Sequence, residues 1–175
     1  LLLLLMSMIW GSAFVAQQIG MEKGLGPMSF NALRFALGCL VLVPVMLWRK
    51  RYLPVVGQKT SLPVRGSLLA GLFLFAGASF QQIGLQYTSS ANAGFITGLY
   101  ILFVPLIGMF FGHKARWSLW AGIAVSLAGL YLLSITGGSL VISKGDGLIL
   151  ICAVFWAAQI LVIDHVANKG DAIQI

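Results

Sequence analysis

The sequence predicts an all-α integral membrane protein, and two features of its composition indicate this fold class. Apolar residues make up 59% of the 175 residues and charged residues only 9%, whereas soluble domains contain about 45–50% and about 25%. The charged residues are also confined to short stretches between long apolar runs. This pattern excludes a soluble enzyme, a disordered tail and a coiled coil, because too few charged groups are available to cover a surface in water.

Six apolar segments are long enough to cross a bilayer, which takes about 20 helical residues. Arg34 is the only charged residue within any of them. We expect the segments to pack as a multi-helix bundle. The chain starts inside an apolar run and stops soon after another, so we expect a fragment that is cut at both ends. The predicted spans are 1–20, 28–48, 66–87, 92–111, 117–135 and 147–163.

Basic residues are distributed unequally between the two sides that alternating spans define. Lys and Arg are enriched in cytoplasmic loops, so the amino terminus and the connections 49–65 and 112–116 are predicted to be cytoplasmic, in a multi-pass protein of the cell (inner) membrane. Only Lys23 and Lys144 fall on the outer side. The eight basic residues on the cytoplasmic side are Arg49, Lys50, Arg51, Lys59, Arg65, Lys114, Arg116 and Lys169.

The first and sixth spans resemble each other when the chain is compared with itself at an offset of 146 residues. A repeat unit of five spans is odd in number, so the second copy must cross the membrane in the opposite direction, as in many secondary transporters. A chance likeness between two apolar helices is the alternative. Five of 29 positions are identical, pairing Leu2 with Leu148, Leu4 with Leu150, Trp10 with Trp156, Lys23 with Lys169 and Gly24 with Gly170.

The span 92–111 contains small residues at helical spacing on one face. Glycines four residues apart let two helix backbones approach closely, so this face is predicted to pack against another helix. Pro105 lacks a backbone N–H and is expected to bend the span. The predicted packing residues are Gly94, Gly98, Pro105, Gly108 and Gly112.

Uncharged polar residues lie beside aromatic residues within several spans. Such residues are costly in lipid unless they face a cavity or a partner, and this mixture suits a polar or amphipathic small molecule. Hydrogen bonding between helices is the alternative. Arg34 either extends to the outer surface or attracts an anionic group. The candidates for a substrate path are Trp10, Gln17, Gln82, Thr97, Tyr100 and Arg34.

Motifs for catalysis and for cofactor binding are missing from the sequence. It has no Gly-rich phosphate loop, no HExxH, no GxSxG and no metal-binding spacing of His, Cys and carboxylates. We therefore expect no enzyme activity, no cofactor and no metal. The two cysteines, Cys39 and Cys152, lie in apolar runs. The expected partners are the lipid bilayer and a small-molecule substrate, with a homodimer left open, and no nucleic acid despite the net charge of +7.

Several segments together resemble EamA-type members of the drug/metabolite transporter superfamily. They cover nearly the whole chain, from Leu1 to about Lys169. The likeness is specific to the family and gives no information on the substrate. The matching segments are Trp10-Gly11-Ser12, Arg34-Phe35, the run from Gln81 to Thr97 (QQIGLQYTSSANAGFIT), the following Pro105 run, and Trp117 through Leu133 with its final Ala128-Gly129-Leu130.

The resemblance implies ten helices in two inverted five-helix repeats around a central cavity, with alternating access and transport of small metabolites, including amino acids. Residues 1–135 would then form the first repeat, 136–146 an outward connection and 147–175 the start of the second repeat. Two other functions stay open at this point, namely a small multidrug-type exporter and a non-transporting membrane assembly subunit.

Overall fold

The computed structural model describes residues 2–52, 64–112, 117–134 and 143–167, and every regular element in these ranges is an α-helix. This confirms the predicted all-α fold. The sixth predicted span extends further at both ends than expected, since its helix includes three charged residues that we had placed outside, Lys144, Asp146 and Asp164. The helices are α1 (Leu2–Glu22), α2 (Pro27–Tyr52), α3 (Val64–Gly84), α4 (Ser90–Gly98), α5 (Tyr100–Phe110), α6 (Trp117–Ser134) and α7 (Lys144–Ala167).

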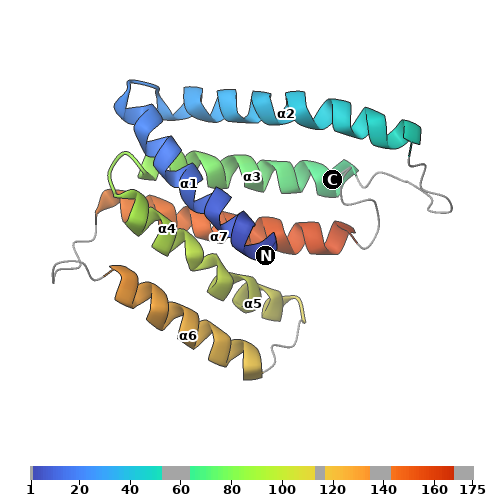
Figure 1. The fold of residues 1–175 in the computed structure, drawn as a ribbon. Helices are drawn as coiled ribbons and strands as arrows, with labels where there is room; N and C mark the ends of the chain where they lie inside the picture. Colours follow the sequence, from blue (N-terminus) through green and yellow to red (C-terminus); the bar gives the residue numbers. More distant parts are fainter. Residues whose placement is uncertain (1, 53–63, 113–116, 135–142, 168–175) are drawn as a thin grey trace.

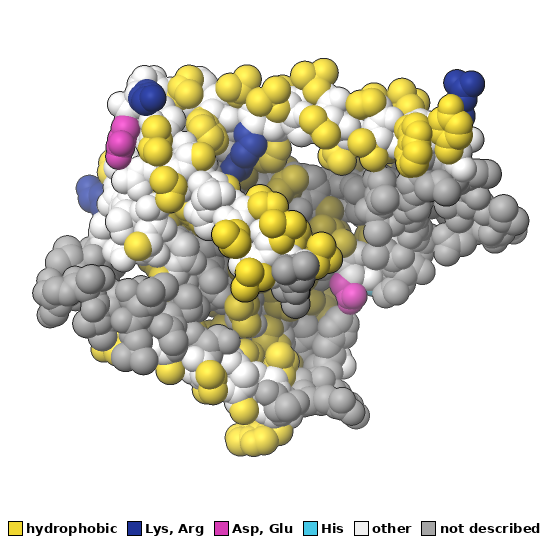
Figure 2. Space-filling view, viewed as in Figure 1, with side chains coloured by type: hydrophobic (Ala, Val, Ile, Leu, Met, Phe, Trp, Pro, Cys, Tyr) yellow, Lys and Arg dark blue, Asp and Glu magenta, His cyan; other side chains and the backbone are white. Residues whose placement is uncertain are grey.

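Five stretches of the described chain are long and apolar enough to cross a membrane, and α4 and α5 together form one of them. The outer face of α2 shows why lipid is needed around this protein. Leu37, Leu40 and Val41 each expose more than half of their surface, and apolar side chains cover α2 on the face shown in Figure 2. An apolar surface of this extent is stable in hydrocarbon and not in water.

The helices run alternately in opposite directions (Figure 1). The end of α2, the start of α3, the end of α5, the start of α6 and the end of α7 lie at one end of the bundle. The end of α1 and the start of α7 lie at the other. Of the basic residues behind the predicted orientation, Lys59, Lys114, Arg116 and Lys169 fall outside the described residues.

The helix α7 begins at Lys144, earlier than predicted, because a capping box stabilises its first turn. The Ser143 Oγ accepts from the Asp146 N–H (3.1 Å), and the Asp146 carboxylate accepts from the Ser143 N–H (2.7 Å). The same carboxylate accepts from the hydroxyl of Thr88 (2.6 Å). These bonds attach the start of α7 to the connection between α3 and α4.

The span that contains Pro105 is interrupted at a different place from the one we expected. The α-helix continues through Pro105 and is instead broken at Leu99, between α4 and α5. There the Leu99 N–H donates to the Ile96 carbonyl three residues earlier (3.1 Å), and the Leu102 N–H donates to the Leu99 carbonyl (2.9 Å). Such i→i−3 bonds tighten the chain locally.

The closest helix packing described joins α3 to α7. An added Cβ at Gly77 would lie 3.4 Å from Phe155 Cβ, and one at Gly84 would lie 2.8 Å from Ile149 Cδ1. At Gly145 an added Cβ would lie 2.5 Å from the Gly84 carbonyl oxygen, so the two backbones are almost in contact. The α3 and α7 helices can therefore approach this closely only because small residues face each other.

The glycines of the span 92–111 have different surroundings. At Gly94 and Gly112 an added Cβ would meet no atom within 4 Å. Gly112 follows the end of α5 with a φ of +83°, a backbone conformation that glycine adopts at little cost where a helix ends. Gly108 is buried, and Gly98 and Pro105 are half-buried.

The substitution Gly145→Ala should destabilise the protein, because its methyl group would collide with the backbone of Gly84 and of Tyr87. Overpacking of this kind costs about 1–3 kcal/mol. The thermal midpoint of the detergent-purified protein, followed by circular dichroism, should fall by several degrees. Gly147→Ala is the matched control, since its Cβ would meet nothing within 4 Å. Equal midpoints for the two variants would contradict the close packing.

Candidate functional site

Three aromatic side chains from three different helices contact one another. Trp10 of α1 makes an edge-to-face contact with Tyr100 of α5, with ring centroids 6.3 Å apart. Trp10 makes a second such contact with Trp156 of α7, at 6.0 Å. Trp10 is still 48% exposed, so much of its indole surface is available to another molecule. The structure thus brings together Trp10 and Tyr100, which were predicted, and adds Trp156.

Buried polar atoms without a hydrogen-bond partner lie on the neighbouring helices. Gln82 of α3 is fully buried, and neither its Oε1 nor its Nε2 has a partner among the described residues. The same is true of the Ser79 hydroxyl. The indole N–H of Trp156 likewise makes no such bond, although the sulfur of Cys152 lies close to it. Because nearly all buried polar groups in proteins are paired, these atoms indicate a site for a polar ligand or for water.

The other predicted polar residues are buried and at least partly paired. Gln17 of α1 donates to the Ala13 carbonyl of its own helix (3.0 Å), and its Oε1 has no described partner. Thr97 of α4 accepts from Gln81 Nε2 at 3.4 Å, a long and weak bond. Thr97 therefore helps to join α3 to α4. Hydrogen bonding between helices was the alternative to a place in the substrate path for this residue.

Phe14 of α1 helps to bring these polar groups together. It packs against a buried cluster of Leu85, Ala93 and Ile149, which come from the residue just after α3, from α4 and from α7. Gln17 lies one turn after Phe14, and Gln82 lies three residues before Leu85. The helices α1, α3, α4 and α7 therefore converge near Gln17 and Gln82.

Arg34 is half-buried and contacts two residues of its own helix, Asn31 and Phe35. One of its Nη atoms donates to Asn31 Oδ1 (2.9 Å). Asn31 is almost completely buried and donates in turn to the Ala78 carbonyl of α3 (3.0 Å). The guanidinium also lies over the Phe35 ring, 5.3 Å from its centroid. Cys152 of α7 also lies near the guanidinium.

Sequence reasoning missed Asn31, Cys152 and Trp156 as parts of this region. Signals in the sequence could have revealed Asn31 and Trp156. Asn31 and Arg34 are three residues apart and therefore share one face of a helix. Trp156 is the residue that aligns with Trp10 in the 146-residue offset.

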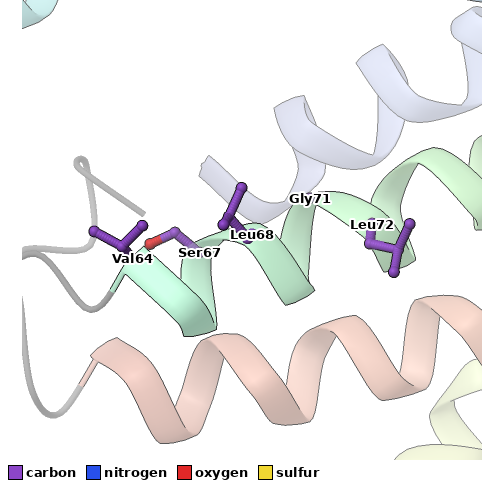
Figure 3. Close-up of a pocket in the computed structure, with 5 residues that line it drawn as sticks. All are labelled: Val64, Ser67, Leu68, Gly71 and Leu72. Atoms are coloured by element: carbon purple, nitrogen blue, oxygen red, sulfur yellow. The ribbon is translucent and has the colours of Figure 1, made fainter.

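A hollow of about 490 Å³ lies elsewhere, along one side of α3 (Figure 3). Its lining is mostly apolar, and it contains none of the predicted substrate-path residues. It is therefore not the candidate site. The lining residues follow one helical face of α3 and are Val64, Ser67, Leu68, Gly71 and Leu72.

The chemistry of the site favours binding over reaction. It offers amide, hydroxyl and indole hydrogen-bonding groups beside aromatic rings, with one cation nearby. In the part of the chain that the structure describes, no three His, Cys, Asp or Glu side chains are grouped so that they could hold a metal ion.

Together, the fold and this interior define a multi-pass membrane protein with a polar and aromatic region between its helices, as membrane transporters have. Residues 1–135 match the EamA-like transporter family. The chain belongs to this family.

Curated relatives are named as transporters without an assigned substrate. The chain is 30% identical over 174 residues to an uncharacterized transporter of Archaeoglobus fulgidus, covering 97% of this chain and 50% of that protein. It is 31% identical over 152 residues to the uncharacterized inner membrane transporter YedA of Escherichia coli K12, covering 85% of this chain and 47% of YedA. The chain thus spans about half the length of these relatives. No solved structure matches the chain.

The substitution Gln82→Met should stabilise the protein, since it removes a buried amide whose two polar atoms have no described partner. Leaving such a group unpaired costs about 1–3 kcal/mol, and the thermal midpoint should rise by a few degrees. Gln81→Met is the matched control on the same helix. It should not raise the midpoint, because it removes the bond to Thr97. Equal midpoint changes for the two variants would show that the Gln82 amide is paired.

Proposed function

We propose that the protein is a secondary transporter that moves small polar or amphipathic metabolites across the cytoplasmic membrane by alternating access. The observation that supports this most is the fully buried, unpartnered Gln82 amide in a bundle whose aromatic residues Trp10, Tyr100 and Trp156 are in contact. The amide can donate and accept hydrogen bonds, and the rings can hold an apolar body. A solute with both parts would satisfy them.

The contact between Trp10 and Trp156 also supports an inverted repeat. These two residues are equivalent at the 146-residue offset, and residues related by a two-fold axis touch only near that axis. The helices α1 and α7 run in opposite directions (Figure 1), as an inverted pair should. Residues 1–135 would form the first repeat, 136–146 a connection and 147–175 the start of the second. The binding site would lie between the repeats, where such transporters bind substrate.

The surplus of basic residues on one side supports a cytoplasmic amino terminus. In this orientation Arg51 at the end of α2 is cytoplasmic, and Lys144 at the start of α7 faces outward. Figure 1 places the end of α2 and the start of α7 at opposite ends of the bundle.

Transport requires the interior residues if this proposal is correct. In proteoliposomes of the natural full-length protein, Gln82→Ala and Tyr100→Ala should each lower the uptake of a radiolabelled amino-acid mixture about fivefold or more, because one lost hydrogen bond or aromatic contact costs on the order of 1 kcal/mol or more. The exposed residues Gln86 and Tyr87 provide matched controls as alanine variants. Wild-type levels in all four variants would remove Gln82 and Tyr100 from the path, and a complete lack of flux for a broad set of metabolites would favour an assembly subunit.

The orientation can be tested with single cysteines in a background that lacks Cys39 and Cys152. A membrane-impermeant maleimide added to intact cells should label Lys144→Cys and not Arg51→Cys. After the membrane is permeabilised, both should react. Labelling of Arg51→Cys alone in intact cells would reverse the assigned orientation, and labelling of both would contradict the transmembrane arrangement.

A further inference from the structure

We propose that Arg34 is a specificity-determining residue that binds the carboxylate of an amphipathic substrate, and that Asn31 is the positioning residue that aims it. This inference rests on the proposed transport function and adds the class of solute. It starts from Arg34, a cation within a membrane span. In the described structure its guanidinium contacts the Asn31 amide and the Phe35 ring.

The hydrogen-bonding capacity of Arg34 exceeds what its described contacts use. A guanidinium has five N–H donors, and the bond to Asn31 Oδ1 occupies one of them. The Asp146 carboxylate already accepts a hydrogen bond with each of its two oxygens, one from the Thr88 hydroxyl and one from the Ser143 N–H. A half-buried guanidinium in a low-dielectric region gains most from an oxyanion, which can accept two N–H bonds in parallel.

The position of Arg34 argues against simple extension to the membrane surface. Asn31 holds the guanidinium from one side and is itself fixed to the Ala78 carbonyl of α3. Cys152, which is fully buried on α7, lies near Arg34. The charge therefore lies toward α3 and α7, inside the bundle, and not toward lipid.

The same stretch of α7 connects the cation to the aromatic cluster. Cys152 and Trp156 are one helical turn apart, about 6 Å along the axis. Trp156 contacts Trp10, which contacts Tyr100. A cationic group and a set of aromatic faces therefore lie near the same stretch of α7. A molecule with a carboxylate at one end and an apolar or aromatic body fits this sequence of groups.

The test compares two probes of nearly equal shape, 3-phenylpropionate and its neutral amide 3-phenylpropionamide. Their affinities for the detergent-purified full-length protein are measured by isothermal titration calorimetry. The wild type should bind the carboxylate about tenfold or more tightly than the amide. In Arg34→Gln this ratio should fall to about one through a loss of carboxylate affinity alone. Unchanged amide affinity shows that the variant is folded.

Two further variants separate charge from position. Asn31→Leu should lower the carboxylate-to-amide ratio at unchanged amide affinity, because the guanidinium loses the acceptor that orients it. Arg51→Gln, a change of an exposed cation on the same helix, should leave the ratio as in the wild type. The proposal would be overturned if Arg51→Gln lowered the carboxylate-to-amide ratio and Arg34→Gln did not.

A lipid phosphate is the other oxyanion that Arg34 could bind, and phosphorus analysis of the purified proteins distinguishes the two sources. Phospholipid lost in Arg34→Gln with an unchanged probe ratio would assign Arg34 to lipid and overturn the proposal. A wild-type protein that binds both probes equally, or neither, would also overturn it. The flux measurement with the Gln82 and Tyr100 variants tests the transport function independently of the role of Arg34.

Discussion

The near contact between the backbones of α3 and α7 is the constraint on which the described structure depends. Because Gly84 and Gly145 have no side chains, the two helices come close enough for Ile149 to be completely buried and for Asp146 to reach Thr88. In lipid no hydrophobic effect drives helices together, so association depends on close packing and on hydrogen bonds. This contact supplies both at the start of α7.

The position of α7 in turn determines what the interior can contain. Phe155 stacks on Phe80 of α3 with ring centroids 5.6 Å apart, and the next residue, Trp156, faces Trp10. The residue one turn earlier, Cys152, lies beside Arg34. A rotation of α7 would move all of these together. The small residues on α3 and α7 therefore fix the geometry of the candidate site without belonging to it.

The sequence was sufficient for five of the six predicted spans and for the family, because length and apolar composition depend on the bilayer and not on tertiary contacts. It did not reveal where α7 begins, since the charges of Lys144 and Asp146 suggested a loop, whereas the capping box of Ser143 and Asp146 makes them helical. It also favoured the glycines of 92–111 over Gly77, Gly84 and Gly145. A glycine motif indicates that an approach is possible, and only the fold shows which helix uses it.

The contrast between two adjacent glutamines shows why part of the interior points to a ligand. Gln81 and Gln82 are both buried, yet Gln81 bonds to Thr97 while the amide of Gln82 has no described partner. Helix cohesion explains the first residue and does not explain the second, because an unpaired amide costs free energy wherever water is scarce. Arg34 is half-buried within a membrane span and has one described hydrogen bond for its five donors. Stability alone would favour apolar residues at both positions, so a solute that completes their hydrogen bonds gives the simplest physical reason for them.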